Sequence, residues 1–123
     1  MESIDISWFE IPVTDINRAV KFYNQLFDTN ISIQDLGQLK MGVLPTKTIG
    51  GALVEHSEWY KPSSTQGALI HLYAGNNLSI ILDKVEEAGG KILIPKRQIS
   101  EILGYMAVIL DSEGNRIALR SEN

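Results

Sequence analysis

The pattern of hydrophobic and polar positions near the start of the chain predicts a strand followed by a helix. Residues 6–13 are typical of a strand, and Thr14 or Asp15 then offers a side-chain oxygen to the free amides of a helix N-terminus. Apolar residues next recur at the three-and-four spacing of a buried helix face, which we expect to end near Asp28. The face consists of Ile16, Ala19, Val20, Tyr23, Leu26 and Phe27.

Short strands separated by turn residues complete the first half of the chain. The breaks fall at Gly37, at Pro45 with its neighbours, and at a turn over Gly50–Gly51. The expected strands span 31–35, 38–44 and 49–56. The first half is therefore expected to have the order β-α-β-β-β.

The second half repeats that order after a connecting segment at 58–66, which contains Pro62 and breaks the periodicity. Asn76 or Asn77 can cap a second helix, which ends at Gly89–Gly90. The expected strands are 68–74, 91–95, 104–110 and 115–120, and the turn residues 111–115 suit a tight hairpin between the last two. Two copies, at 4–57 and 67–121, indicate one α+β domain over residues 1–123.

Composition narrows the classes of function. The 123 residues contain no cysteine, which excludes disulfides, thiolate nucleophiles and cysteine metal sites. A net charge of −4, with Lys96–Arg97 as the only basic doublet, argues against nucleic-acid binding. The first residues are acidic and no apolar run approaches the ~20 residues that span a bilayer, so we expect no membrane association and a cytoplasmic, soluble protein.

Four motifs resemble those of the vicinal oxygen chelate superfamily, which includes glyoxalase I, extradiol dioxygenases and the fosfomycin- and bleomycin-resistance proteins. They are Ile11–Asp15 leading to Phe22–Tyr23, Gly50–Val54, Gly89–Lys91 and Asp111–Ile117. The resemblance implies two paired βαβββ modules whose strands form a curled mixed sheet, or cup, with the helices outside. It also implies a ligand in the cup, often a divalent metal, and a homodimer.

The superfamily's metal-ligand positions can be carried over by counting from these motifs. The first, fifth and last strands place Trp8, Leu69 and Ala118 there, and the fourth-strand position lies between Leu53 and Glu55. Side chains of tryptophan, leucine and alanine do not bind metals, so no cofactor is expected. A divalent metal at a displaced site stays an open alternative.

If the superfamily's ligand positions point into the cup, the alternation of strand side chains identifies their neighbours. The first strand then contributes Glu10 beside Trp8, and the fifth contributes His71 and Tyr73. Glu10 and His71 are therefore candidate catalytic residues for general acid and base chemistry. A structural ion pair for Glu10 and a structural role for His71 are the alternatives.

The remaining candidates are ligand-binding residues. Arg116 and Arg120 on the last strand could bind a carboxylate or phosphate, or could be solvated or dimer-facing charges. Glu55 and His56 end a strand beside the connecting loop, where surface exposure is the alternative. Trp8, Tyr73 and Tyr105 could line a pocket, although aromatic residues in strands are usually packing residues.

Three functions remain open. The first is a protein that binds a small molecule in the cup without the usual divalent metal. The second is a glyoxalase-like lyase, isomerase or dioxygenase with a displaced site. The third is a non-catalytic interaction subunit, for which an exposed Trp59–Tyr60 pair in the connection is the only sign.

Overall fold

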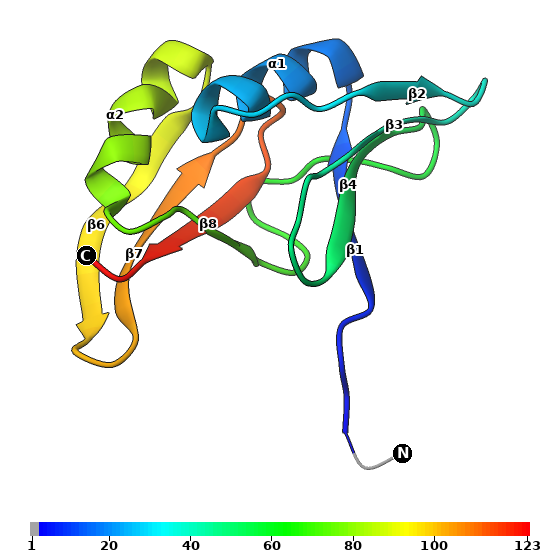
Figure 1. The fold of residues 1–123 in the computed structure, drawn as a ribbon. Helices are drawn as coiled ribbons and strands as arrows, with labels where there is room; N and C mark the ends of the chain where they lie inside the picture. Colours follow the sequence, from blue (N-terminus) through cyan, green and yellow to red (C-terminus); the bar gives the residue numbers. More distant parts are fainter. Residues whose placement is uncertain (1–2) are drawn as a thin grey trace.

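The computed structural model describes residues 3–123, which form eight strands and two helices (Figure 1). The first module contains β1 (Trp8–Val13), α1 (Ile16–Phe27), β2 (Ile33–Asp35), β3 (Lys40–Val43) and β4 (Gly50–Glu55). The second contains β5 (Ile70–Tyr73), α2 (Leu78–Ala88), β6 (Lys91–Ser100), β7 (Gly104–Leu110) and β8 (Arg116–Ser121). The expected repeat of two βαβββ modules is confirmed.

Each module forms its own four-stranded mixed sheet. The strand orders are β1-β4-β3-β2 and β5-β8-β7-β6, and in both sheets the first and last strands of the module pair in parallel. The two sheets are not joined into a closed cup. β6 continues to Ser100, past the expected end at residue 95, because irregular pairing with β7 persists to the hairpin at Gly104.

Both helices cover the same side of the molecule and lie next to each other above the two sheets (Figure 1). Beneath them, alternate residues of both sheets enter one shared hydrophobic core, in which Ile11 and Leu53 represent the first sheet and Ile117 and Leu119 the second. All four are at most 2 % exposed. Each sheet therefore has one face covered by helices and an opposite face, which we call its open face. No helix in residues 3–123 is long and apolar enough to cross a membrane.

The helix ends follow from local chemistry. Asp15, rather than Thr14, is the N-cap of α1, and its carboxylate accepts a hydrogen bond from the Arg18 amide. Asp28 ends that helix in a left-handed conformation with φ of 51°. Asn77 caps α2 in the same way through the Ser79 amide, and Gly89 ends it at φ of 113°.

Gly50 and Gly51 lie within β4, so the expectation of a turn at this pair was wrong. Gly50 is paired with Trp8 and Gly51 with Phe9 on the neighbouring parallel strand. A Cβ on Gly50 would lie 2.7 Å from the Trp8 ring, and one on Gly51 would lie 2.4 Å from the Phe9 ring. The diglycine therefore makes room for one aromatic ring on each face of the sheet.

A carboxylate from the second module holds the start of α1. Glu113, in the hairpin between β7 and β8, accepts hydrogen bonds from the amides of Thr14 and Asp15, both at 2.9 Å, and pairs with the Arg18 guanidinium at 2.6 Å. Burial alone would raise the Glu113 pKa, but these bonds outweigh it and lower the pKa to about 2. The two modules are thus connected by charge-assisted hydrogen bonds as well as by the core.

Candidate functional site

The open face of the first sheet carries three alternate residues of β1. Trp8, Glu10 and Pro12 point away from the helices, as the alternation predicted. Both oxygens of the Glu10 carboxylate accept hydrogen bonds, one from the Tyr60 hydroxyl at 2.5 Å and one from the Trp8 indole nitrogen at 3.3 Å. The bond to Glu10 raises the Tyr60 pKa, so the phenol stays a donor. This arrangement is a carboxylate held between two aromatic side chains.

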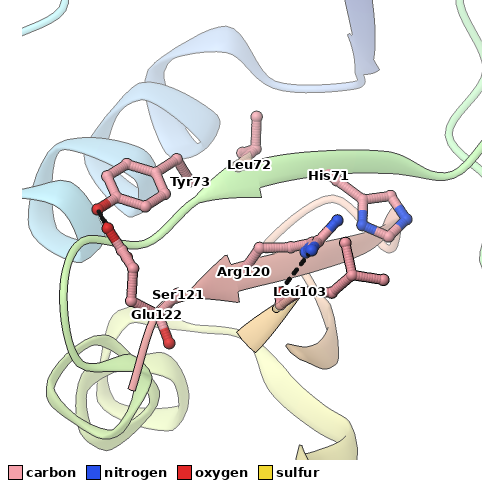
Figure 2. A pocket seen from close by; sticks show the side chains of 7 residues that line it. All are labelled: His71, Leu72, Tyr73, Leu103, Arg120, Ser121 and Glu122. Carbon is pink, nitrogen blue, oxygen red and sulfur yellow. Dashed lines mark hydrogen bonds between the residues drawn. The ribbon is translucent and has the colours of Figure 1, made fainter. Parts of the chain in front are cut away.

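The open face of the second sheet carries His71 and Tyr73. His71 is paired with Ala118, and Tyr73 with Arg120, on the adjacent parallel strand. His71, Tyr73 and Arg120 line an open pocket of about 330 Å³ at the ends of β5 and β8 (Figure 2). Leu72, Leu103, Ser121 and Glu122 complete its walls. A pocket of this size is at the small end of the range for ligand sites.

Two polar side chains of this pocket already form hydrogen bonds with neighbouring residues. Arg120 donates a hydrogen bond from Nη2 to the Leu103 carbonyl oxygen at 2.7 Å, and its guanidinium points toward His71 and Leu103 (Figure 2). Tyr73 donates its hydroxyl to the Glu122 carboxylate at 2.5 Å, a bond that raises the Tyr73 pKa. The remaining guanidinium N–H groups of Arg120 are available to an anion beside the apolar side chain of Leu103.

The two candidate catalytic residues lie on different sheets. Within residues 3–123 no hydrogen bond or ion pair joins Glu10 to His71, and the bonds of Glu10 go to Trp8 and Tyr60. His71 is instead grouped with Tyr73 and Arg120 in the pocket. The structure therefore divides the candidate residues into two groups, one around Glu10 on the first sheet and one around His71 on the second.

Glu55 points to the helix-covered side of its sheet. Its carboxylate accepts a hydrogen bond from the Ile16 amide at 2.8 Å, in the first turn of α1. The second module uses Ser121 in the same way, because its hydroxyl accepts from the Leu78 amide at the start of α2. In both modules a side chain at the end of the last strand thus satisfies a free helix amide.

The other candidates are dispersed. The His56 ring stacks on Trp59 with centroids 4.8 Å apart, and its Nδ1 accepts from the Glu58 amide. The Tyr105 ring packs against the core, with the Lys96 ammonium 5.0 Å from the ring centroid. Arg116 is half-buried at the start of β8.

Sequence reasoning missed three residues that complete these groups, namely Tyr60, Leu103 and Glu122. Tyr60 lies 50 positions from Glu10 and Glu122 lies 49 from Tyr73, so no local pattern connects them. The one usable signal was a carboxylate on a predicted sheet strand, which requires a partner or water.

The register also settles which fourth-strand residues share the open face. Ala52 and Val54 are paired with Glu10 and Pro12 there, whereas Leu53 and Glu55 face the helices. The side chains of Ala52 and Val54, like those of Trp8, Leu69 and Ala118 at the positions carried over from the resemblance, offer no oxygen or nitrogen suited to a divalent metal. Within residues 3–123 no group of three or more His, Asp or Glu side chains could hold a metal ion. The side chains at the positions that the resemblance assigns to metal ligands are thus apolar or aromatic in this chain.

Solved structures with this fold include enzymes and binding proteins. The hypothetical protein SA1046 from S. aureus is 22 % identical, with 98 % of this chain and 94 % of that one covered and a TM-score of 0.71. A V278E mutant of glyoxalase I from Zea mays is 21 % identical with a TM-score of 0.73, over 94 % of this chain and 45 % of that one. TnmS3, an antibiotic-binding protein from Streptomyces sp. CB03234, is 21 % identical with a TM-score of 0.67, over 100 % of this chain and 99 % of that one.

At these identities the likeness establishes the fold, and a comparison with curated proteins found no match. The family model described as Glyoxalase/Bleomycin resistance protein/Dioxygenase superfamily matches residues 5–119. Because that range runs from before β1 into β8 and so covers most of the chain, the chain belongs to the glyoxalase/bleomycin resistance protein/dioxygenase superfamily.

Proposed function

We propose that this protein binds a small organic molecule in the pocket of the second sheet, without a divalent metal. The observation that carries the proposal is the grouping of Arg120, His71 and Tyr73 around a cavity with a leucine wall. A few polar groups on an apolar surface are typical of small-molecule sites. The antibiotic-binding activity named for TnmS3, a protein of the same fold, supports this class of function.

The ligand proposed for this pocket is an apolar molecule with one anionic group. Arg120 supplies a planar, permanently charged fork for a carboxylate or phosphate. Leu103 supplies the contact area for the apolar part. An aromatic carboxylate combines both features at a size that a cavity of about 330 Å³ accepts.

The side chains at the superfamily's metal positions support a metal-free site. Trp8, Leu69 and Ala118 replace groups that would have to be deprotonated nitrogen or oxygen ligands. The separation of Glu10 from His71 also gives no support to paired acid and base chemistry between them. We therefore favour binding over turnover.

We also propose a homodimer. Ile4 and Ile6, in the segment before β1, are 102 % and 66 % exposed, and this segment extends away from both sheets (Figure 1). Exposed apolar residues at the edge of a sheet are typical of a surface that another chain covers. A second copy of this chain is the partner we propose for that segment.

The pocket is tested with 2-naphthoate and its uncharged counterpart 2-naphthamide, titrated calorimetrically into metal-stripped protein. We expect saturable binding of 2-naphthoate that is weakened about tenfold in Arg120→Gln, since a charge-assisted contact is lost. Arg97→Gln removes a positive charge from β6 of the same sheet, outside the pocket, and should bind as the wild type does. Equal binding of the amide and the carboxylate, or equal losses in both variants, would contradict the proposal.

A further inference from the structure

We infer a second binding site, on the open face of the first sheet, in which Glu10, Trp8 and Tyr60 receive an organic ammonium cation. This site lies outside the pocket of the second sheet. Its ligand is a cation, whereas the ligand proposed for that pocket carries an anionic group. It therefore goes beyond the proposed function and can fail without affecting it. The inference rests on how these three side chains are held.

Glu10 is the negative centre of the site. Its two oxygens accept hydrogen bonds from Tyr60 at 2.5 Å and from Trp8 at 3.3 Å, and both donors are neutral. Within residues 3–123 the one ion pair is that between Arg18 and Glu113, so no cationic side chain compensates Glu10. The carboxylate thus lies on an exposed surface, and two hydrogen bonds from aromatic side chains hold its position.

The Trp8 ring is positioned by the sheet. It lies over Gly50, where any Cβ would approach its Cζ3 to 2.7 Å, and the side chain remains 44 % exposed. One part of the indole is therefore in contact with backbone while another part faces solvent. An exposed indole beside a carboxylate is the combination that favours a cation through both charge and the ring quadrupole.

Tyr60 is positioned by a turn of the connecting segment. Its amide donates to the His56 carbonyl oxygen at 3.4 Å, and the His56 ring is stacked on Trp59. This turn brings a residue 50 positions away onto Glu10. The phenol hydroxyl is thereby held against the carboxylate, which makes Tyr60 the second aromatic residue of the site.

The composition of the site indicates which kind of cation fits. A metal ion such as Ca²⁺ or Mg²⁺ takes six or more oxygen ligands, and a single carboxylate between two aromatic rings does not offer them. An alkylated ammonium group needs few hydrogen bonds and gains from contact with ring faces. The chemical class assigned to this site is therefore a small quaternary or alkylated amine.

The test uses choline and its neutral isostere 3,3-dimethyl-1-butanol as probes. Because Trp8 and Trp59 are the only tryptophans, a Trp59→Phe background makes the fluorescence report on Trp8 alone. We expect choline to change this fluorescence saturably and to bind about tenfold more tightly than the alcohol. Equal affinities for the two probes would overturn the inference without requiring any further variant.

A matched pair of charge-removing variants, both in the Trp59→Phe background, locates the site. Glu10→Gln should reduce choline affinity by about tenfold. Glu58→Gln, which removes an exposed carboxylate from the connecting segment that contains Tyr60, should leave the affinity for choline unchanged. Tyr60→Phe should give an intermediate loss, since the ring remains and the hydroxyl is removed. Unchanged affinity in a folded Glu10→Gln protein, with thermal unfolding like that of the Trp59→Phe background, would exclude the site.

Discussion

Trp8 and Gly50 are direct partners on the parallel strands β1 and β4, and the indole ring lies over the glycine backbone. Their neighbours Phe9 and Gly51 repeat the arrangement on the opposite face. One ring thus belongs to the open face and the other to the side covered by helices. The diglycine of the sequence motif therefore makes room for a ring on the open face and for a ring in the packing beneath the helices.

The two glycines should respond differently to alanine. Gly51→Ala forces the Phe9 ring to move within packed surroundings, so we expect a loss of about 1–3 kcal/mol in the free energy of unfolding. Gly50→Ala should cost less, because the exposed Trp8 ring can shift into solvent. Urea unfolding measures both losses, and Trp8 fluorescence in a Trp59→Phe background should change in Gly50→Ala. A larger loss for Gly50→Ala would contradict this assignment.

Glu113 should make stability depend on acid pH. Its pKa is about 2 in the folded protein against an ordinary value of 4.5, so it stabilises the fold above about pH 4.5. That contribution is lost as the pH falls from about 4.5 toward 2. Glu113→Gln should lower the free energy of unfolding at neutral pH by about 1–3 kcal/mol, since hydrogen bonds to Arg18 and to the helix amides weaken.

The same measurement must separate the effect of Glu113 on stability from that of Asp111. Burial raises the pKa of Asp111, against the effect of its hydrogen bonds, so its titration acts in the opposite direction. Comparing wild type with Glu113→Gln across pH 2–7 cancels the Asp111 contribution. The difference between the two proteins should shrink at low pH, and a difference that stays constant would contradict the role of Glu113.

Glu55 should behave as a helix-capping group. Glu55→Ala removes the acceptor of the Ile16 amide and should cost about 1 kcal/mol, whereas Glu55→Gln keeps an acceptor oxygen and should cost less. Ser121→Ala, the counterpart at α2, should also destabilise the fold. Denaturant unfolding gives all three values. Normal stability combined with lost binding of 2-naphthoate would instead favour a ligand contact by Glu55.

Sedimentation equilibrium should give twice the 13.7 kDa mass of one chain. An Ile4→Asp/Ile6→Asp double variant should weaken that association, because charges replace the exposed apolar groups of the segment before β1. Ile80→Asp introduces a charge at an exposed position of α2 and serves as the control. A wild-type monomer, or a dimer unaffected by the double change, would exclude the proposed interface.

Periodicity predicted the fold well because the core depends on it. The stripe from Ile16 to Leu26 and the alternation in β1 determine which side chains are buried, and both are local properties of the chain. The length of β6 could not be predicted, since it depends on pairing with β7 rather than on its own residues. The diglycine was assigned to a turn because its real cause is a pair of rings on another strand.

The sequence predicted only part of each candidate site. Alternation placed Glu10 and His71 on open faces, but their partners come from segments about 50 residues away or from a hairpin tip. Glu55 resembled a ligand by position, and only the register of β4 places it beneath α1. Contacts between residues far apart in the sequence determine which exposed polar residues lie together. These contacts cannot be predicted from the local pattern of a single sequence.

Metal-independent ligand binding is tested most directly by thermal unfolding of metal-stripped protein with Ni²⁺, Zn²⁺, Mn²⁺ or Fe²⁺, compared with 2-naphthoate and EDTA. A ligand at 100 times its dissociation constant adds about 2.7 kcal/mol to the free energy of unfolding. We predict a saturable rise with 2-naphthoate in EDTA, and no rise with any metal in a His56→Ala variant, which removes one of the two imidazoles of the chain. A metal-dependent rise that survives His56→Ala and disappears in Glu10→Gln or His71→Ala would contradict the account.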